Sequence, residues 1–146
     1  MPPLIGWSAA EGRVSALGWI LFGVLFLWQI PHFMAIAWTY RRDYAAVNFP
    51  MLPVRDEAGG RVALWSFAAT LGLVGVSVLP AFLRLDSAWY AAAALGAGAW
   101  FLLRAAQFLR RRDRDAAARR LFMFSLGYLP LLLGLLVADR LMGRHP

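Results

Sequence analysis

The stretch that decides the fold runs from residue 14 to residue 44 and reads VSALGWILFGVLFLWQIPHFMAIAWTYRRDY. Its apolar part, Val14–Tyr40, exceeds the roughly 20 residues that a helix needs to cross a bilayer. Gln29 and His32 interrupt this apolar run, and the charged segment Arg41–Asp43 follows it directly. Polar side chains are costly inside hydrocarbon unless a partner, water or a ligand satisfies them. The stretch therefore predicts a membrane-spanning helix whose polar residues serve a site.

The rest of the chain has the same apolar character. Of its 146 residues 61% are hydrophobic, against roughly 45–50% in an ordinary soluble domain. The segments long and apolar enough to span a membrane are Val14–Tyr40, Val62–Leu83, Ala88–Leu109 and Leu121–Leu141. We therefore predict an all-α polytopic membrane bundle of four helices, with residues 1–146 forming a single membrane domain.

The net charge of +7 comes entirely from arginine, because the sequence contains no lysine. Ten of the fifteen arginines lie in the segments that join spans one and two and spans three and four: Arg41, Arg42, Arg55, Arg61, Arg110, Arg111, Arg112, Arg114, Arg119 and Arg120. On a soluble protein this charge would suggest nucleic acid, but arginines that flank apolar spans set topology. We expect no nucleic-acid partner and place both segments in the cytoplasm. The absence of cysteine excludes disulfides and thiolate metal sites.

A polar stripe follows one face of the first span. Gln29, His32, Ile36, Thr39 and Asp43 are separated by steps of three and four residues, which puts them on one side of a helix. That face points at a partner helix, a wet cavity or a ligand. His32 is a candidate ligand for a haem iron or another metal, or a hydrogen-bond partner of a substrate. The alternative is a structural histidine bonded to a neighbouring helix.

The charged residues after the first span are candidates for a phosphate site. Asp43 can hold Mg²⁺, which prefers one or two carboxylates with phosphates and water, and Arg41 and Arg42 can grip a diphosphate. The alternative is a solvated ion cluster at a helix end. Asp113–Asp115 is typical of a salt-bridged topogenic loop, and Asp56–Gly60 of a flexible turn before the second span.

Three motifs in the first third of the chain carry a family resemblance. They are Pro2–Trp7 (PPLIGW), Trp28–Phe33 (WQIPHF) and Asp43–Val54 (DYAAVNFPMLPV). In order and spacing they resemble the protoheme IX farnesyltransferases, or haem O synthases, among the UbiA-type intramembrane prenyltransferases. The resemblance covers essentially the whole chain.

The resemblance implies a fold and an activity. Members are helical bundles of about nine spans, and the four spans here resemble the last four. They lie in the bacterial cytoplasmic (inner) membrane and transfer a farnesyl group from farnesyl diphosphate to the vinyl group of haem B, giving haem O. Mg²⁺ bridges the diphosphate to two aspartate motifs on cytoplasmic loops. The implied partners are farnesyl diphosphate, haem B, membrane lipid, and an N-terminal half or haem-copper oxidase assembly factors.

The resemblance also assigns residues. Asp43 would be the metal ligand, and Arg41 or Arg42 would contact the diphosphate. The implied binding residues are His32, Gln29, Trp28, Tyr44 and Met51, of which the first three would face the haem. Met51 and Pro53 would shape the loop that covers the site.

Two departures from the family pattern qualify this expectation. Val47 stands where related prenyltransferases have a second aspartate, and the first aspartate-rich motif is missing. We therefore expect a C-terminal fragment, a mis-assigned start or one part of a split protein, inactive on its own. Two other classes fit the residues. One is a non-catalytic membrane haem-binding or assembly subunit that uses His32. The other is a transporter-like bundle whose polar stripe lines a path.

Overall fold

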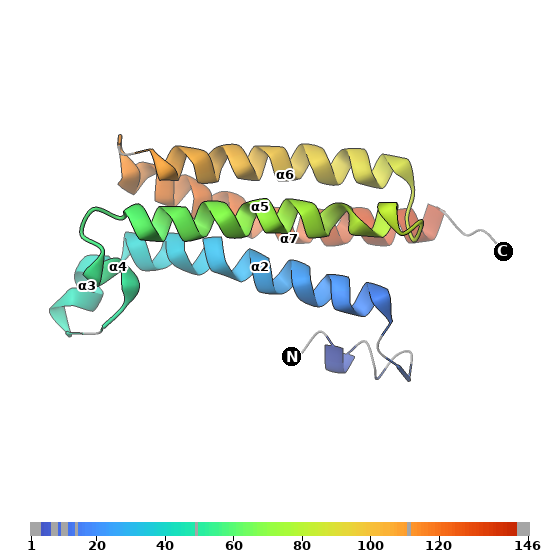
Figure 1. Ribbon diagram of the computed structural model, residues 1–146, viewed down its shortest axis with the longest axis horizontal. Helices are drawn as coiled ribbons and strands as arrows, with labels where there is room; N and C mark the ends of the chain where they lie inside the picture. The colour runs from blue at the N-terminus through green and yellow to red at the C-terminus, as the bar shows by residue number, and fades with distance from the viewer. Residues whose placement is uncertain are drawn as a thin grey trace.

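The protein is an all-helical bundle in a computed structural model that describes residues 4–6, 9, 12–13, 15–48, 50–110 and 112–142 (Figure 1). Its long helices are α2 (Ala16–Thr39), α5 (Gly60–Phe82), α6 (Ala88–Leu109) and α7 (Arg114–Met142). Each is long and apolar enough to cross a membrane, which confirms the predicted all-α bundle of four spans. Predictions that rest on Pro2, Pro3, Trp7, Val14, Phe49 and Arg111 lie outside the described residues.

The four long helices close into a ring. α2 packs against α5 and α7, and α6 packs against the same two helices from the other side. The short helices α3 (Arg41–Ala46) and α4 (Leu52–Arg55) join α2 to α5 at the left end of the view, where α6 also gives way to α7 (Figure 1). Both arginine-rich segments therefore lie at one end of the bundle, as the sequence predicted.

Helix α5 begins with a built cap where the sequence predicted a flexible turn. The Oδ2 atom of Asp56 accepts hydrogen bonds from the backbone N–H groups of Arg61 at 2.7 Å and Val62 at 3.0 Å. A carboxylate at this position satisfies otherwise unpaired helix donors and suits the helix dipole. Gly59 is buried in a left-handed conformation with a φ of 66°, against the ring of Trp38. The turn before the second span is thus confirmed, and capping and packing connect it to α5 and to Trp38.

Helix α7 begins at Arg114, well before the predicted start at Leu121. The expectation that Asp113–Asp115 forms a loop is therefore wrong for Arg114 and Asp115, which belong to the first turn of the helix. The guanidinium group of Arg114 donates to the carbonyl oxygens of Phe108 at 3.3 Å and Leu109 at 3.2 Å. These bonds satisfy the open end of α6, and Asp115 complements the dipole of α7.

Buried polar groups inside the bundle are paired across helices. The hydroxyl of Tyr90 on α6 donates to the carbonyl oxygen of Ser77 on α5 at 3.0 Å. The Oγ atom of Ser77 lies 3.2 Å from the hydroxyl of Tyr128 on α7. Because hydrocarbon offers no competing partner, such bonds tie three helices together at the level of the core.

The end of the bundle opposite the arginine-rich segments is also fastened. In the short α5–α6 link, the backbone N–H and the hydroxyl of Ser87 both donate to the carboxylate of Asp139 on α7, the former at 2.9 Å. Asp86 pairs with Arg140 at 3.0 Å, and burial raises the pKa of its carboxyl group while Arg140 opposes that rise. The short link and these contacts hold α5 and α6 as an antiparallel pair.

Gly59→Ala should lower the free energy of unfolding by about 2 kcal/mol, because a left-handed conformation is strained for alanine. An added Cβ would also lie 2.4 Å from the Trp38 ring and 2.9 Å from Arg114 Cδ. The measurement is thermal unfolding in detergent micelles, followed by circular dichroism. Gly60→Ala is the matched control, since a Cβ there meets nothing within 4 Å. Equal losses in both variants would contradict the account of Gly59.

Candidate functional site

A cavity of about 430 Å³ opens at the arginine-rich end, where α2 and α3 face α7. Its walls are Ile36, Thr39, Tyr40, Asp43, Arg119, Phe122 and Met123. The carboxylate of Asp43 and the guanidinium of Arg119 come from different helices, and the remaining walls are largely apolar. Such a chamber suits a ligand with a charged head and an apolar body.

A break between α2 and α3 places Asp43 at this cavity. α2 ends at Thr39, Tyr40 takes a non-helical conformation with a φ of −100° and a ψ of 15°, and α3 restarts at Arg41. The predicted stripe is therefore not one continuous helix face, because Asp43 belongs to α3. Ile36, Thr39 and Asp43 nevertheless line the same cavity. The Thr39 hydroxyl donates to the carbonyl oxygen of Ala35 at 2.8 Å and is occupied within its own helix.

The two charged groups of the cavity are unengaged. Neither the Asp43 carboxylate nor the Arg119 guanidinium forms a hydrogen bond or ion pair with another residue that the structure describes, and both residues are exposed. Their charges are opposite, so a metal-bound anion can be held from both sides. Over the described ranges, no group of three or more His, Cys, Asp or Glu side chains gathers into a metal cage.

His32 and Trp28 extend from α2 toward α7, one to two helical turns before the α2 residues that line this cavity. Trp28 Nε1 donates to the carbonyl oxygen of Ser125 at 2.8 Å, and its ring stacks on His32 with centroids 4.6 Å apart. The Nδ1 atom of His32 lies 2.7 Å from Ser125 Oγ. Phe122, a wall of the cavity, contacts the His32 ring at a centroid distance of 5.3 Å. The contact between α2 and α7 thus includes both rings predicted to face the haem.

The hydrogen bonds around Ser125 assign the tautomer of His32. The Ser125 hydroxyl has one proton and donates it to the carbonyl oxygen of Phe122 at 2.6 Å. With that proton placed on the Phe122 carbonyl oxygen, Nδ1 is assigned as the donor in the bond between His32 and Ser125 Oγ. In the neutral ring, Nε2 therefore keeps its lone pair and remains able to accept a hydrogen bond or bind a metal.

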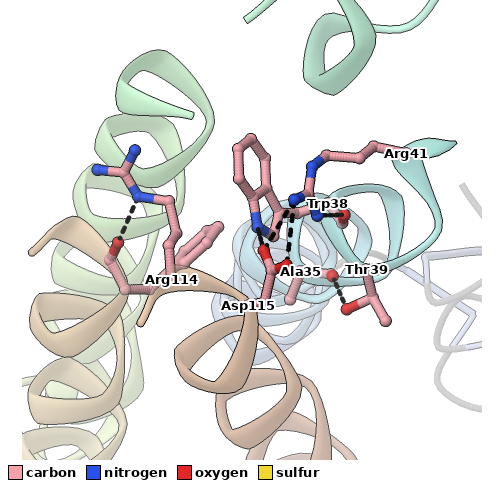
Figure 2. Close-up of polar contacts among 7 residues, drawn as sticks. Ala35, Trp38, Thr39, Arg41, Arg114 and Asp115 are labelled. Atoms are coloured by element: carbon pink, nitrogen blue, oxygen red, sulfur yellow. Dashed lines mark hydrogen bonds and ion pairs between the residues drawn. The ribbon is translucent and has the colours of Figure 1, made fainter. Parts of the chain in front are cut away.

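A second polar cluster locks the end of α2 to the start of α7 (Figure 2). Trp38 Nε1 donates to Asp115 Oδ1 at 2.8 Å, and Arg41 pairs with the same carboxylate at 3.0 Å. Arg41 also donates to the Trp38 carbonyl oxygen at 2.8 Å and lies over the indole, 4.1 Å from its centroid. Arg41 is therefore engaged in this cluster, and its predicted contact with a diphosphate stays a prediction.

The other predicted site residues do not line the cavity. Arg42 and Gln29 are exposed, whereas Tyr44 is half-buried. Met51 is half-buried at the start of α4, where its carbonyl oxygen accepts from the backbone of Val54 at 3.0 Å. Of the predicted site residues only Asp43 is in the wall of this cavity, and the roles of the others stay predictions.

Three contributions of α7 escaped the sequence reasoning. Arg119, Phe122 and Met123 line the cavity, although the sequence identified Arg119 only as a topogenic charge. The available signal was their spacing of three and four residues, which puts a cation beside two apolar side chains on one helix face. Asp115 and Ser125 offered no such signal, because their partners are far away in the sequence.

The family match and the named relatives of this chain agree with one another. The UbiA prenyltransferase family matches residues 1–127 of this chain. A protein from Opitutus terrae named protoheme IX farnesyltransferase is 64% identical over 96% of this chain and 48% of its own length. Proteins of the same name from Thermosynechococcus vestitus and Bordetella pertussis are each 42% identical, over 99% and 98% of this chain and 46% and 48% of theirs. No solved structure matches.

The fold and the site define a multi-pass α-helical membrane protein with a charged cavity at one end of its bundle. The chain belongs to the UbiA prenyltransferase family. It spans about half the length of the curated relatives it matches.

Asp115→Ala should lower the free energy of unfolding by about 1–3 kcal/mol, because the buried Trp38 N–H loses its acceptor. A double-mutant cycle with Trp38→Phe isolates this contact, since phenylalanine has no N–H to leave unpaired. We expect Asp115→Ala to cost much less in the Trp38→Phe background, measured by denaturant unfolding in micelles. Equal costs in both backgrounds would show that the hydrogen bond does not stabilise the α2–α7 contact.

Proposed function

We propose that this chain supplies part of the site that transfers a farnesyl group from farnesyl diphosphate to the vinyl group of haem B, giving haem O. The observation that carries the proposal is the pair Asp43 and Arg119 in the wall of a cavity whose other walls are largely apolar. The similarity to proteins named protoheme IX farnesyltransferase along nearly the whole chain supports it. We further propose the bacterial inner membrane as its location, with the arginine-rich end in the cytoplasm.

The diphosphate would bind between Arg119 and Asp43. A guanidinium group forms strong, charge-assisted hydrogen bonds to phosphate oxygens. Asp43 is the one carboxylate in the cavity wall, which fits Mg²⁺ held mainly by the diphosphate and water. Bound there, Mg²⁺ would offset the negative charge that develops on the departing diphosphate.

The apolar walls would protect the reacting carbon. The C–O bond would break with diphosphate as the leaving group, and the vinyl group would form a bond to the same carbon of the farnesyl chain. The positive charge left on the other vinyl carbon would then be captured by a water molecule, which releases a proton and leaves a hydroxyl group there. Ile36, Phe122 and Met123 exclude water from this carbon, which water would otherwise capture. The ring faces of Tyr40 and Phe122 stabilise positive charge through their quadrupoles.

His32 is proposed to act on the haem side. Its Nδ1–H is held by Ser125, so Nε2 is the atom left for the iron or a polar group of the haem. Phe122 contacts the imidazole and lines the cavity, which makes its ring the boundary between the His32 position and the proposed farnesyl chamber.

Asp43→Asn should reduce haem O formation by roughly 100-fold, because it removes the carboxylate proposed to stabilise the leaving group. The assay is HPLC of haem O in a membrane that lacks haem O synthase. It uses this chain fused to the part of the Opitutus terrae relative that the chain does not match. Glu57→Gln, another exposed carboxylate change at the same end, is the control. We expect the chain alone to form no haem O. A correctly inserted fusion without activity, or an Asp43→Asn fusion as active as the control, would refute the proposal.

Arg119→Gln should raise the KM for farnesyl diphosphate by about tenfold, since it removes a charge-assisted bond worth roughly 1.5 kcal/mol or more. The measurement is the dependence of initial rate on farnesyl diphosphate in the same fusion, with haem B saturating. Arg112→Gln is the matched control, because Arg112 is exposed at the same end and does not line the cavity. An unchanged KM would remove Arg119 from the proposed diphosphate site.

A further inference from the structure

A second cavity, of about 330 Å³, lies between α6 and α7 at the arginine-rich end. Its walls are Arg104, Arg119, Arg120, Met123 and Phe124. We propose that this cavity binds the phosphate headgroup of an anionic membrane phospholipid. This site shares Arg119 and Met123 with the cavity of the proposed transfer reaction, but it would bind a different ligand.

Charge makes the cavity an anion site. Three guanidinium groups line it, and its walls contain no carboxylate. The guanidinium groups of Arg119 and Arg120 form no hydrogen bond or ion pair with any residue among those described, so their charges are not neutralised within the described fold. Three like charges around one small volume repel one another, and a bound anion relieves that repulsion. Basic pockets between transmembrane helices at the cytoplasmic side are typical sites for anionic headgroups.

Arg104 is held in place for such a role. It lies within the membrane-length helix α6, about 7–8 Å before the helix ends at Leu109. Its Nη1 atom donates to Gln107 Oε1 at 3.2 Å, and its guanidinium lies over the Trp100 ring, 5.0 Å from the centroid. These contacts limit the positions of the guanidinium while leaving other donors for a phosphate. A cation held at this depth suits a headgroup at the membrane interface.

The apolar half of the cavity favours a lipid over a free phosphate ion. The ring of Phe124 is held by Phe101 and Tyr128, with centroids 5.5 Å and 6.3 Å away. Below the arginines, exposed apolar side chains continue along the outer faces of α6 and α7: Trp100, Leu103, Met123 and Leu126. A phosphate ion gains nothing from these groups, whereas a phospholipid places its phosphate on the arginines and its acyl chains on the apolar faces.

The two cavities are adjacent, but some residues line only the second one and can be changed to test it alone. Arg119 and Met123 line both, which puts the proposed lipid beside the proposed farnesyl diphosphate site. Arg104, Arg120 and Phe124 line the second cavity and are absent from the walls of the first. Variants of Arg104 and Arg120 therefore probe the lipid without changing the walls of the substrate cavity.

The test is native mass spectrometry of the purified full chain in detergent, titrated with phosphatidylglycerol or phosphatidylcholine of matched acyl chains. We expect tighter binding of phosphatidylglycerol. Each arginine lost should weaken that binding roughly fivefold, so Arg104→Gln with Arg120→Gln should weaken it about 25-fold. Arg112→Gln, an equal charge change outside the cavity walls, should leave it unchanged. Circular dichroism checks folding, and Arg120→Gln alone, at an exposed position, provides the test if the double variant does not fold.

Several results would overturn the proposal. Unchanged phosphatidylglycerol binding in the variants would show that Arg104 and Arg120 are not part of the site. An equal loss of binding in Arg112→Gln would show that only the net charge of the protein matters. Equal binding of both lipids would show that headgroup charge is not recognised. Displacement of phosphatidylglycerol by inorganic phosphate at low millimolar concentration would identify the ligand as a free phosphate ion.

Discussion

Trp38, at the end of α2, donates its indole N–H to Asp115 at the start of α7, while Gly59 and Phe108 pack against its ring. One side chain thus joins α2, the turn before α5, the end of α6 and the start of α7. The ring is almost completely buried, so a lost hydrogen bond there has no substitute in water. Because α7 begins beside Trp38, the positions of Arg119, Phe122 and Met123 on the next turns of that helix depend on this contact.

The arginines near this contact differ in whether their side chains are bonded within the protein. Arg41 lies over Trp38 and pairs with Asp115, so its charge is neutralised within the protein. Arg114 closes the end of α6 through two carbonyl oxygens. The side chains of Arg119 and Arg120 make no such bond to any residue the structure describes. Arg119 lines both cavities, and Arg120 lines the second. A count of arginines predicts which end of the bundle is basic, but only the tertiary contacts show which of these cations remain available to a ligand.

The sequence predicted the periodic parts of this protein and missed the parts made by long-range pairing. The bounds of α6 were correct because its apolar run ends at Arg110, directly after Leu109. The start of α7 was missed because its first turns are polar and alanine-rich. Those turns are stabilised by Arg114 and Asp115, whose partners lie on other helices. Asp43 was identified from its place after the first span, whereas the cavity around it is completed by α7.

Phe122 stands between two parts of the α2–α7 contact, the cavity and the packed rings around His32. On one side Phe122 lines the cavity that holds Asp43 and Arg119, and on the other it contacts His32. The Ser125 hydroxyl bonds back to the Phe122 carbonyl oxygen and accepts from His32 Nδ1. One turn of α7, Phe122–Ser125, therefore sets both the orientation of the His32 imidazole and the position of the Phe122 wall of the cavity. A polar residue inside a membrane helix is a functional hypothesis whose partner has to be named. For His32 the named partner is Ser125, which occupies Nδ1, so the proposed haem role depends on Nε2.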